Sequence, residues 1–79
     1  MSHELEVKND YYNSGNLKKE IHYKNREREG VETCWYENGK KKHTIHFNDG
    51  IENGIRKEWY VDGTITFEGN YVDGNEEIK

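Results

Sequence analysis

The sequence contains no proline, a single cysteine, and no apolar run near the roughly 18 residues that a membrane-spanning helix needs. One cysteine, Cys34, cannot form an internal disulfide, which is typical of proteins in the reducing cytoplasm. The first residues, Met1 to Glu6, lack the apolar segment of a secretory signal peptide. We therefore expect a cytoplasmic protein without a membrane span.

Apolar residues are also scarce, since they make up 30% of the 79 residues while charged residues make up 35%. Such a balance approaches that of disordered chains. The aromatic content of 13% argues against disorder, because each aromatic side chain can bury a large apolar area. Eight glycines without proline indicate strands joined by glycine turns. We expect one folded domain, residues 1–79, of marginal stability.

An excess of basic residues is missing as well, because 12 Lys and Arg face 16 Asp and Glu, for a net charge of −4. A nucleic-acid partner is therefore not expected, since phosphate binding calls for a basic patch. The lack of a basic amphipathic helix also argues against a phospholipid surface. The acidic balance would suit a basic protein partner.

The main positive feature of the sequence is a gapless internal repeat of 24 residues (36 − 12 = 60 − 36 = 24) in three copies, at about 6–29, 30–53 and 54–77. Equivalent residues form aromatic and glycine columns: Tyr11, Trp35 and Trp59; Tyr12, Tyr36 and Tyr60; Tyr23, Phe47 and Tyr71; Gly15, Gly39 and Gly63; Gly30 and Gly54. We interpret the glycines as turn residues with a structural role.

Each copy predicts one β-hairpin. In the second copy the period-two alternation predicts strands over 31–36 and 40–47, joined by a turn at 37–39. A three-residue loop, in which a type I turn is followed by Gly39 in the left-handed region, suits all three copies. The chain is thus predicted to be all-β, a single antiparallel six-strand meander.

This turn geometry predicts a register in which Trp35 lies opposite Lys41 and Val31 lies opposite Ile45. The apolar residues of both strands then share one face, a set that a slip of one residue would divide. That face would hold Val7, Tyr11, Leu17, Ile21, Tyr23, Val31, Trp35, Ile45, Phe47, Ile55, Trp59, Ile65, Phe67 and Tyr71. The opposite face would gain three cross-strand charge pairs, Lys8 with Glu20, Asp10 with Lys18, and Arg56 with Glu68.

The unit, an aromatic residue followed by Tyr-x-x-Gly, a second strand ending in an aromatic residue, and then Asn/Asp-Gly-x-x-x-Gly, resembles the MORN repeat. More closely it is similar to the bacterial MORN-repeat variant, whose members are often described as antitoxin components. The match extends over about residues 6–75 and rests on Tyr12, Gly15, Tyr23, Trp35, Tyr36, Gly39, Phe47, Trp59, Tyr60, Gly63 and Tyr71, with the turns Asp49-Gly50…Gly54 and Asp73-Gly74. Two positions depart from the pattern. Arg26 replaces the glycine of the other inter-unit turns, and Gly69 stands where the other copies have isoleucine.

No catalytic residue, metal site or cofactor is predicted, and we do not expect an enzyme. His22 and His46 would lie about 10 Å apart, too far to share an ion. Cys34 is expected on the polar face opposite Lys42, without a histidine and an acid on the same side to activate it. The glycine spacing fits turns and not a phosphate-binding loop.

A one-layer sheet leaves its apolar face uncovered, so the aromatic columns are either its core or an adhesive surface. The candidate partner-binding residues are Tyr11, Tyr12, Trp35, Tyr36, Phe47, Trp59, Tyr60 and Tyr71, with Tyr12, Tyr36 and Tyr60 as an exposed ladder on the charged face. The resemblance implies a protein–protein interaction module, with a toxin as one kind of partner. A homodimer or larger homo-oligomer and a phospholipid surface are the alternatives.

Overall fold

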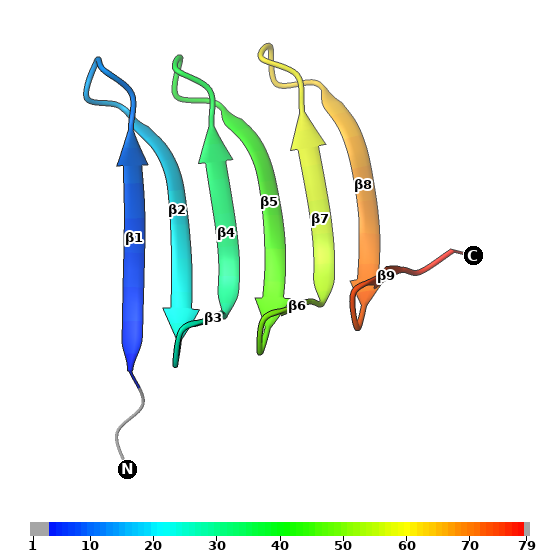
Figure 1. Cartoon of the computed structure of the whole chain (residues 1–79). Coiled ribbons are helices and arrows are strands. Elements are labelled where there is room, and N and C mark those ends of the chain that lie inside the picture. Colours follow the sequence, from blue (N-terminus) through cyan, green and yellow to red (C-terminus); the bar gives the residue numbers. More distant parts are fainter. Residues whose placement is uncertain (1–3, 79) are drawn as a thin grey trace.

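The computed structural model describes residues 4–78, which form one antiparallel sheet (Figure 1). Its six long strands follow chain order: β1 (Leu5–Tyr11), β2 (Leu17–Lys24), β4 (Gly30–Trp35), β5 (Lys41–Asn48), β7 (Gly54–Trp59) and β8 (Ile65–Val72). Three two-residue strands pair back onto the ends of β2, β5 and β8: β3 (Glu27–Arg28), β6 (Ile51–Glu52) and β9 (Asn75–Glu76). The predicted all-β meander of three hairpins is confirmed, with nine strands in place of six.

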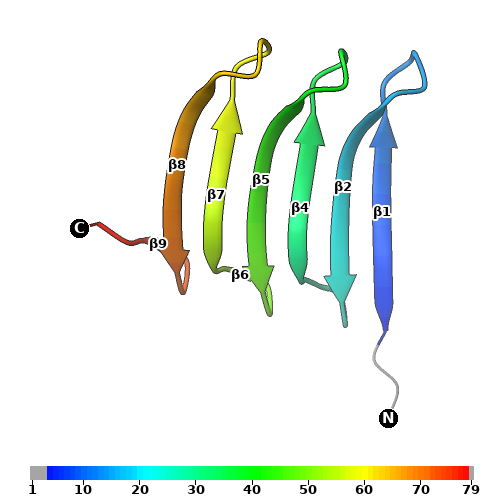
Figure 2. The same cartoon turned by 180° about the vertical axis from the view of Figure 1, so that it is seen from behind.

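The sheet is a single layer with extents of 42 × 38 × 10 Å, and within residues 4–78 no other element covers either face (Figures 1 and 2). Among the described residues the only buried apolar side chains are Ile21, which is 8% exposed, and Cys34, which is 6% exposed. Within residues 4–78 no helix is long and apolar enough to cross a membrane. Backbone pairing and contacts between successive units therefore have to provide much of the stability that a second layer would supply.

The hairpin tips have the predicted three-residue loop. In the second unit the amide of Tyr36 donates to the carbonyl of Lys40 (2.8 Å), and the amide of Gly39 donates to the carbonyl of Tyr36 (2.9 Å). Gly39 has a φ of 89°, in the left-handed region that glycine adopts without steric cost. The other two tips repeat this pattern.

The predicted register is correct beside each tip and wrong beyond it. Trp35 pairs with Lys41 as expected, but Cys34 pairs with His43, so Lys42 is an unpaired bulge residue. A bulge places one extra residue in one strand and shifts all later pairs by one. Val31 consequently lies opposite His46 and not opposite Ile45. Lys18 and Thr66 are skipped in the same way in the first and third hairpins.

The bulges divide the predicted apolar set between the two faces of the sheet. Residues that pair directly share a face, and neighbours along a strand alternate. The first face, the Trp face, carries Val7, Tyr11, Leu17, Val31, Trp35, Ile55, Trp59 and Ile65. The second, the Phe face, carries Ile21, Tyr23, Cys34, Ile45, Phe47, Phe67 and Tyr71. The single apolar face expected from the sequence was therefore wrong.

The three predicted charge pairs are wrong for the same reason. In the observed register Lys8 lies opposite Ile21, Asp10 opposite Lys19, and Arg56 opposite Gly69. Glu68 instead lies opposite Lys57, and the two side chains form an ion pair of 3.8 Å.

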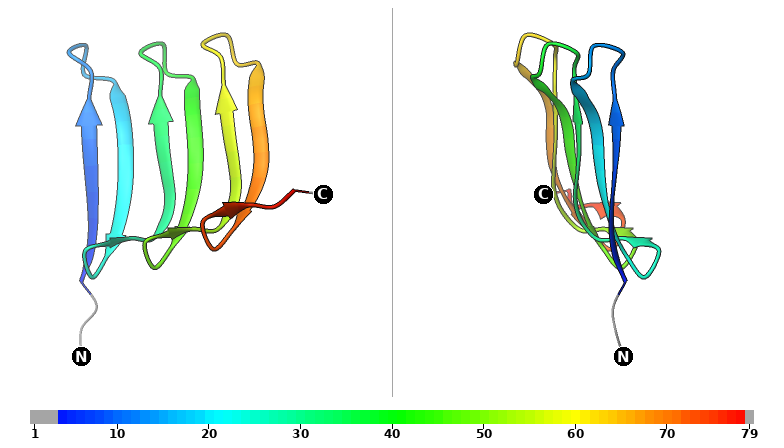
Figure 3. Two further views of the ribbon diagram at one scale, coloured as in Figure 1. Left: turned by 45° about the vertical axis from the view of Figure 1, so that its right-hand side comes forward. Right: turned by 90° about the vertical axis from the view of Figure 1, so that its left-hand side faces the viewer.

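The turns between units bend the lower edge of the sheet out of its plane (Figure 3). Both central residues of each turn have positive φ, and Arg26 holds a φ of 70° where the later turns have glycine. Each later turn is tied to the unit before it, because the amide of Gly50 donates to the carbonyl of Arg28 (2.8 Å) and that of Gly74 to the carbonyl of Glu52 (2.8 Å). The bent edge thus repeats in register with the hairpins.

Side chains of one unit also donate to the backbone of the next. The hydroxyl of Tyr12 donates to the carbonyl of Trp35 (2.7 Å), and the hydroxyl of Tyr36 donates to the carbonyl of Trp59 (2.6 Å). Both tyrosines are half-buried, whereas Tyr60, in the last unit that residues 4–78 contain, is 62% exposed. The expected exposed ladder is therefore reduced to its last member.

We expect Tyr36→Phe to lower the free energy of unfolding by about 1 kcal/mol, because it leaves the Trp59 carbonyl without this donor. Tyr60→Phe is the matched control, since it removes the same hydroxyl from the same repeat position where nothing in residues 4–78 receives it. Urea unfolding followed by tryptophan fluorescence measures both changes. Equal losses in the two variants would contradict a stabilising contact between units.

Candidate binding surface and polar cluster

The Trp face is the more open surface and is hollowed around its two tryptophans. A groove of about 450 Å³ runs between the second and third hairpins, and Trp59 is one of its walls. The lining residues of this groove are Val31, Lys41, Thr44, His46, Ile55, Lys57, Trp59 and Glu68. Two shallower hollows at the tips lie beside Trp59 (about 350 Å³) and Trp35 (about 430 Å³). Each hollow on this face therefore borders an aromatic ring.

The polar groups around these hollows are partly fixed by the sheet itself. His46 Nδ1 donates to the carbonyl of Ile55 (2.7 Å), and Lys57 is held by Glu68. Lys40 and Lys41 line the tip hollow next to Trp59, and neither forms an ion pair within the described part of the chain. The surface around Trp59 is thus locally basic although the whole chain is acidic.

Three of the four aromatic residues of the Phe face, all except Phe67, are covered by cations of the chain itself. Lys8 lies 5.5 Å from the ring centroid of Tyr23, and Arg56 lies 4.6 Å from that of Tyr71. Phe47 receives Arg28 at 5.4 Å. A cation over a ring is attracted by the electron-rich ring face and also shields it from solvent. Phe47 and Tyr71, two of the candidate binding residues, are therefore already engaged.

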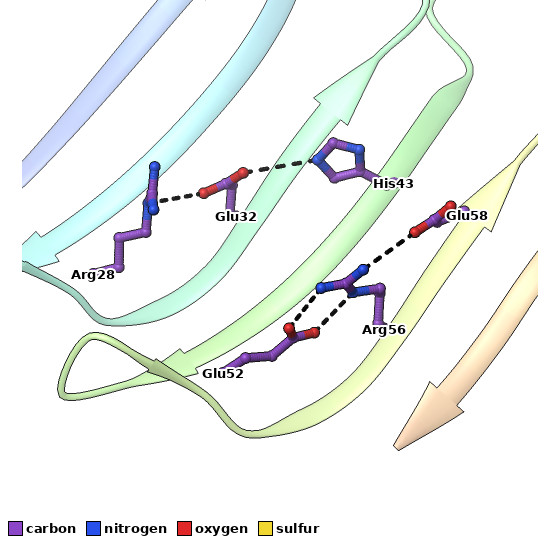
Figure 4. A network of polar contacts seen from close by, with 6 residues as sticks. All are labelled: Arg28, Glu32, His43, Glu52, Arg56 and Glu58. Carbon is purple, nitrogen blue, oxygen red and sulfur yellow. Dashed lines mark hydrogen bonds and ion pairs between the residues drawn. The ribbon is translucent and has the colours of Figure 1, made fainter. Parts of the chain in front are cut away.

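The carboxylates beneath these cations form two ion-pair networks with reversed charges (Figure 4). Where the second unit meets the third, Arg56 makes a bidentate pair with Glu52 (2.6 and 2.9 Å) and reaches Glu58 (3.6 Å). Twenty-four residues earlier the same two main positions hold Arg28 and Glu32, with Arg28 Nε 3.1 Å from Glu32 Oε1. The Glu–Arg order at the junction of the second and third units is thus an Arg–Glu order at the junction of the first and second.

Because of this reversal, Glu32 has neighbours that the predicted register did not place beside it. Glu32 is only 8% exposed, and its Oε2 lies 3.7 Å from His43 Nε2. Cys34, expected opposite Lys42, instead lies opposite His43 and on the same face as Glu32. The expectation that no histidine and acid share the face of the cysteine was wrong, because the bulge at Lys42 changes the face of every later residue of β5.

The geometry does not favour Cys34 as a nucleophile. Its burial raises the pKa of the thiol, an effect that nearby Lys19 opposes without cancelling. A protonated thiol is the less reactive form at neutral pH. The sequence does contain a signal for this cluster, because the three positions are chemically different in the middle unit. The middle unit has Glu32, Cys34 and His43. The equivalent residues are Lys8, Asp10 and Lys19 in the first unit and Arg56, Glu58 and Phe67 in the third.

The fold and these surfaces define the class of the protein, a β-hairpin repeat protein with two open faces. The family model for the MORN repeat variant matches three times, at residues 10–25, 28–49 and 52–73. The chain therefore belongs to the MORN repeat variant family. No curated protein and no solved structure matches it.

Arg28→Glu should destabilise the fold by about 1–3 kcal/mol, because it leaves the buried Glu32 carboxylate without its guanidinium partner. The double variant Arg28→Glu/Glu32→Arg should recover most of this loss, because it installs the arrangement that Glu52 and Arg56 have at the junction of the second and third units. Thermal unfolding of the three proteins measures both steps. A double variant no more stable than the single one would contradict the equivalence of the two networks.

Proposed function

We propose that this chain is a protein-binding repeat module whose docking surface is the Trp face. The observation that carries the proposal is the contrast between the faces. Trp35 and Trp59 line open hollows, whereas three of the four aromatic rings of the Phe face are covered by Lys8, Arg28 and Arg56. Repeats of this family are binding modules for proteins and membranes.

The chemistry of the Trp face specifies the partner further. Tryptophan is among the residues that carry most binding energy at protein interfaces, where it accepts an apolar anchor from the other side. Lys40 and Lys41 beside Trp59 favour a partner that presents carboxylates around such an anchor. This local charge differs from the net charge of −4, which alone would have favoured a basic partner.

A narrower form of the proposal concerns the kind of partner. The resemblance to the bacterial repeat variant suggests a toxin, which this chain would neutralise in the cytoplasm as an antitoxin or immunity component. Co-expression of the chain with each neighbouring gene, scored by cell growth, tests this form. Growth arrest that the chain relieves, and that its Trp59→Ala variant does not relieve, supports it. If no neighbouring gene product is toxic, the toxin hypothesis is rejected, whereas the proposed docking surface on the Trp face can still be tested with other partners.

A second candidate function is structural self-assembly, which the ends of the array favour. β1 and β8 are edge strands, and within the sheet the junctions β2–β4 and β5–β7 are antiparallel. A second copy could continue the array by placing its β1 beside β8, where its Tyr11 carbonyl would meet the unused hydroxyl of Tyr60. Light scattering across a concentration series, with Tyr60→Phe as the weakened variant, distinguishes this candidate from partner binding.

Once a partner is purified, we expect Trp59→Ala to weaken its binding at least about tenfold, which corresponds to about 1.4 kcal/mol. Tyr60→Ala is the matched control, since it removes a neighbouring exposed aromatic side chain from the Phe face and should change affinity by less than about twofold. Isothermal titration calorimetry gives both values. A larger loss of affinity in Tyr60→Ala than in Trp59→Ala would place the binding surface on the Phe face and contradict the proposal. Sedimentation with anionic vesicles in place of a protein would indicate membrane binding instead.

A further inference from the structure

The cluster on the Phe face contains three side chains that are common ligands of transition metals. Glu32 and Cys34 are two residues apart on β4, and His43 is the cross-strand neighbour of Cys34 on β5. One ligand atom from each of the three lies within 4.8 Å of the others. Among residues 4–78 no other group of histidine, cysteine and carboxylate side chains meets this condition.

Two polar atoms of the cluster are buried without a hydrogen bond, Glu32 Oε1 and His43 Nε2. A buried polar atom that has lost its water and gained no hydrogen bond costs about 1–3 kcal/mol. Arg28 offsets part of this cost for Glu32 by charge, although its approach to Oε1 does not form an aligned hydrogen bond. His43 Nε2 has no such relief, since the nearest carboxylate oxygen is 3.7 Å away. A cation placed between His43 and Glu32 Oε2 would remove the deficit of His43 Nε2.

We propose that Glu32, Cys34 and His43 form a binding site for a single Zn²⁺ ion or a similar transition-metal ion. Zinc takes sulfur, nitrogen and oxygen ligands at about 2.0–2.3 Å, so two ligand atoms on a tetrahedron are separated by about 3.3–3.8 Å. The 3.7 Å between Glu32 Oε2 and His43 Nε2 is slightly longer than the about 3.3–3.5 Å expected for an oxygen–nitrogen pair on zinc. Small side-chain rotations would bring the three ligand atoms into place.

The charges of the site also balance for a divalent cation. Ligation deprotonates a thiol, and a thiolate with a carboxylate neutralises two positive charges. Arg28 would remain on the outer oxygen of Glu32 and orient the carboxylate, as groups that contact metal ligands commonly do. Lys19 and Lys42 favour the thiolate electrostatically, while Glu32 and Asp10 oppose them until a cation is bound.

Access to the ion and a fourth ligand are provided by the adjoining hollow. Cys34 and His43 line a cavity of about 270 Å³ that also touches Lys19 and Tyr12. A water molecule can complete four-coordination from this side, which is the arrangement of zinc sites with three protein ligands. Only the middle unit has the site, since the equivalent residues of the first unit include two lysines and those of the third include Arg56 and Phe67.

Titration of the full chain, free of a polyhistidine tag, with Zn²⁺ and separately with Co²⁺ tests the proposal. We expect one Zn²⁺ per chain by calorimetry, and with Co²⁺ a thiolate charge-transfer band together with the visible bands of tetrahedral cobalt. Cys34→Ser and His43→Gln should each weaken Zn²⁺ binding at least about 100-fold, because loss of even a group that only supports a metal ligand costs about 10–100-fold. Zn²⁺ should raise the melting temperature of the parent chain and not that of these variants.

Two further variants test the need for the Glu32 carboxylate and the selectivity for His43. Arg28→Glu/Glu32→Arg removes the carboxylate while keeping an ion pair that the junction of the second and third units shows to be compatible with the fold, and it should weaken Zn²⁺ binding. His22→Gln removes a half-exposed histidine from the Trp face and should leave Zn²⁺ affinity unchanged. Undiminished binding in both Cys34→Ser and His43→Gln, absence of the charge-transfer band, or one Zn²⁺ per two chains would overturn the proposal.

Discussion

One unpaired residue in the second strand of every hairpin determines which side chains share a face. The tip fixes the pair Trp35–Lys41, and the bulge at Lys42 then moves every later residue of β5 by one place. A shift of one residue exchanges the two faces of a strand. The composition of both faces, and with it the cation-covered rings, the open tryptophans and the polar cluster, depends on this local irregularity.

The features of the structure that could be predicted from the sequence are those that individual residue types specify. The turn glycine Gly39 and the 24-residue columns specify the loop type, the hairpins and their order, and all of these hold in the structure. The bulge position has no characteristic residue type, because Lys18, Lys42 and Thr66 are ordinary polar strand residues. Every error about faces and charge pairs follows from that one omission. The contact of Tyr36 with Trp59 was missed for a different reason, since it depends on how one hairpin lies against the next.

The absence of a second layer explains why charges lie so close to aromatic rings. A ring on an uncovered sheet can be shielded only by side chains of the same chain, and long cationic residues do this while keeping their charge in water. Lys8 and Arg56 cover their rings from one repeat position, which in the middle unit is Glu32. Arg28 therefore covers Phe47 from a position four residues earlier. This exchange is what allows a buried carboxylate to stand beside Cys34 and His43.

The two candidate surfaces meet in one strand. Trp35 and Cys34 are neighbours on β4, so alternation directs one side chain to the Trp face and the other to the Phe face. The Cys34–His43 pair is also the first pair beyond the bulge, and the pair Trp35–Lys41 is the last before it. An ion bound by Cys34 and His43 would cross-link β4 and β5 at this point and oppose a slip of the register. Because such a slip would turn the residues of β5 to the opposite face, the ion would preserve the groove beside Trp59 without occupying it.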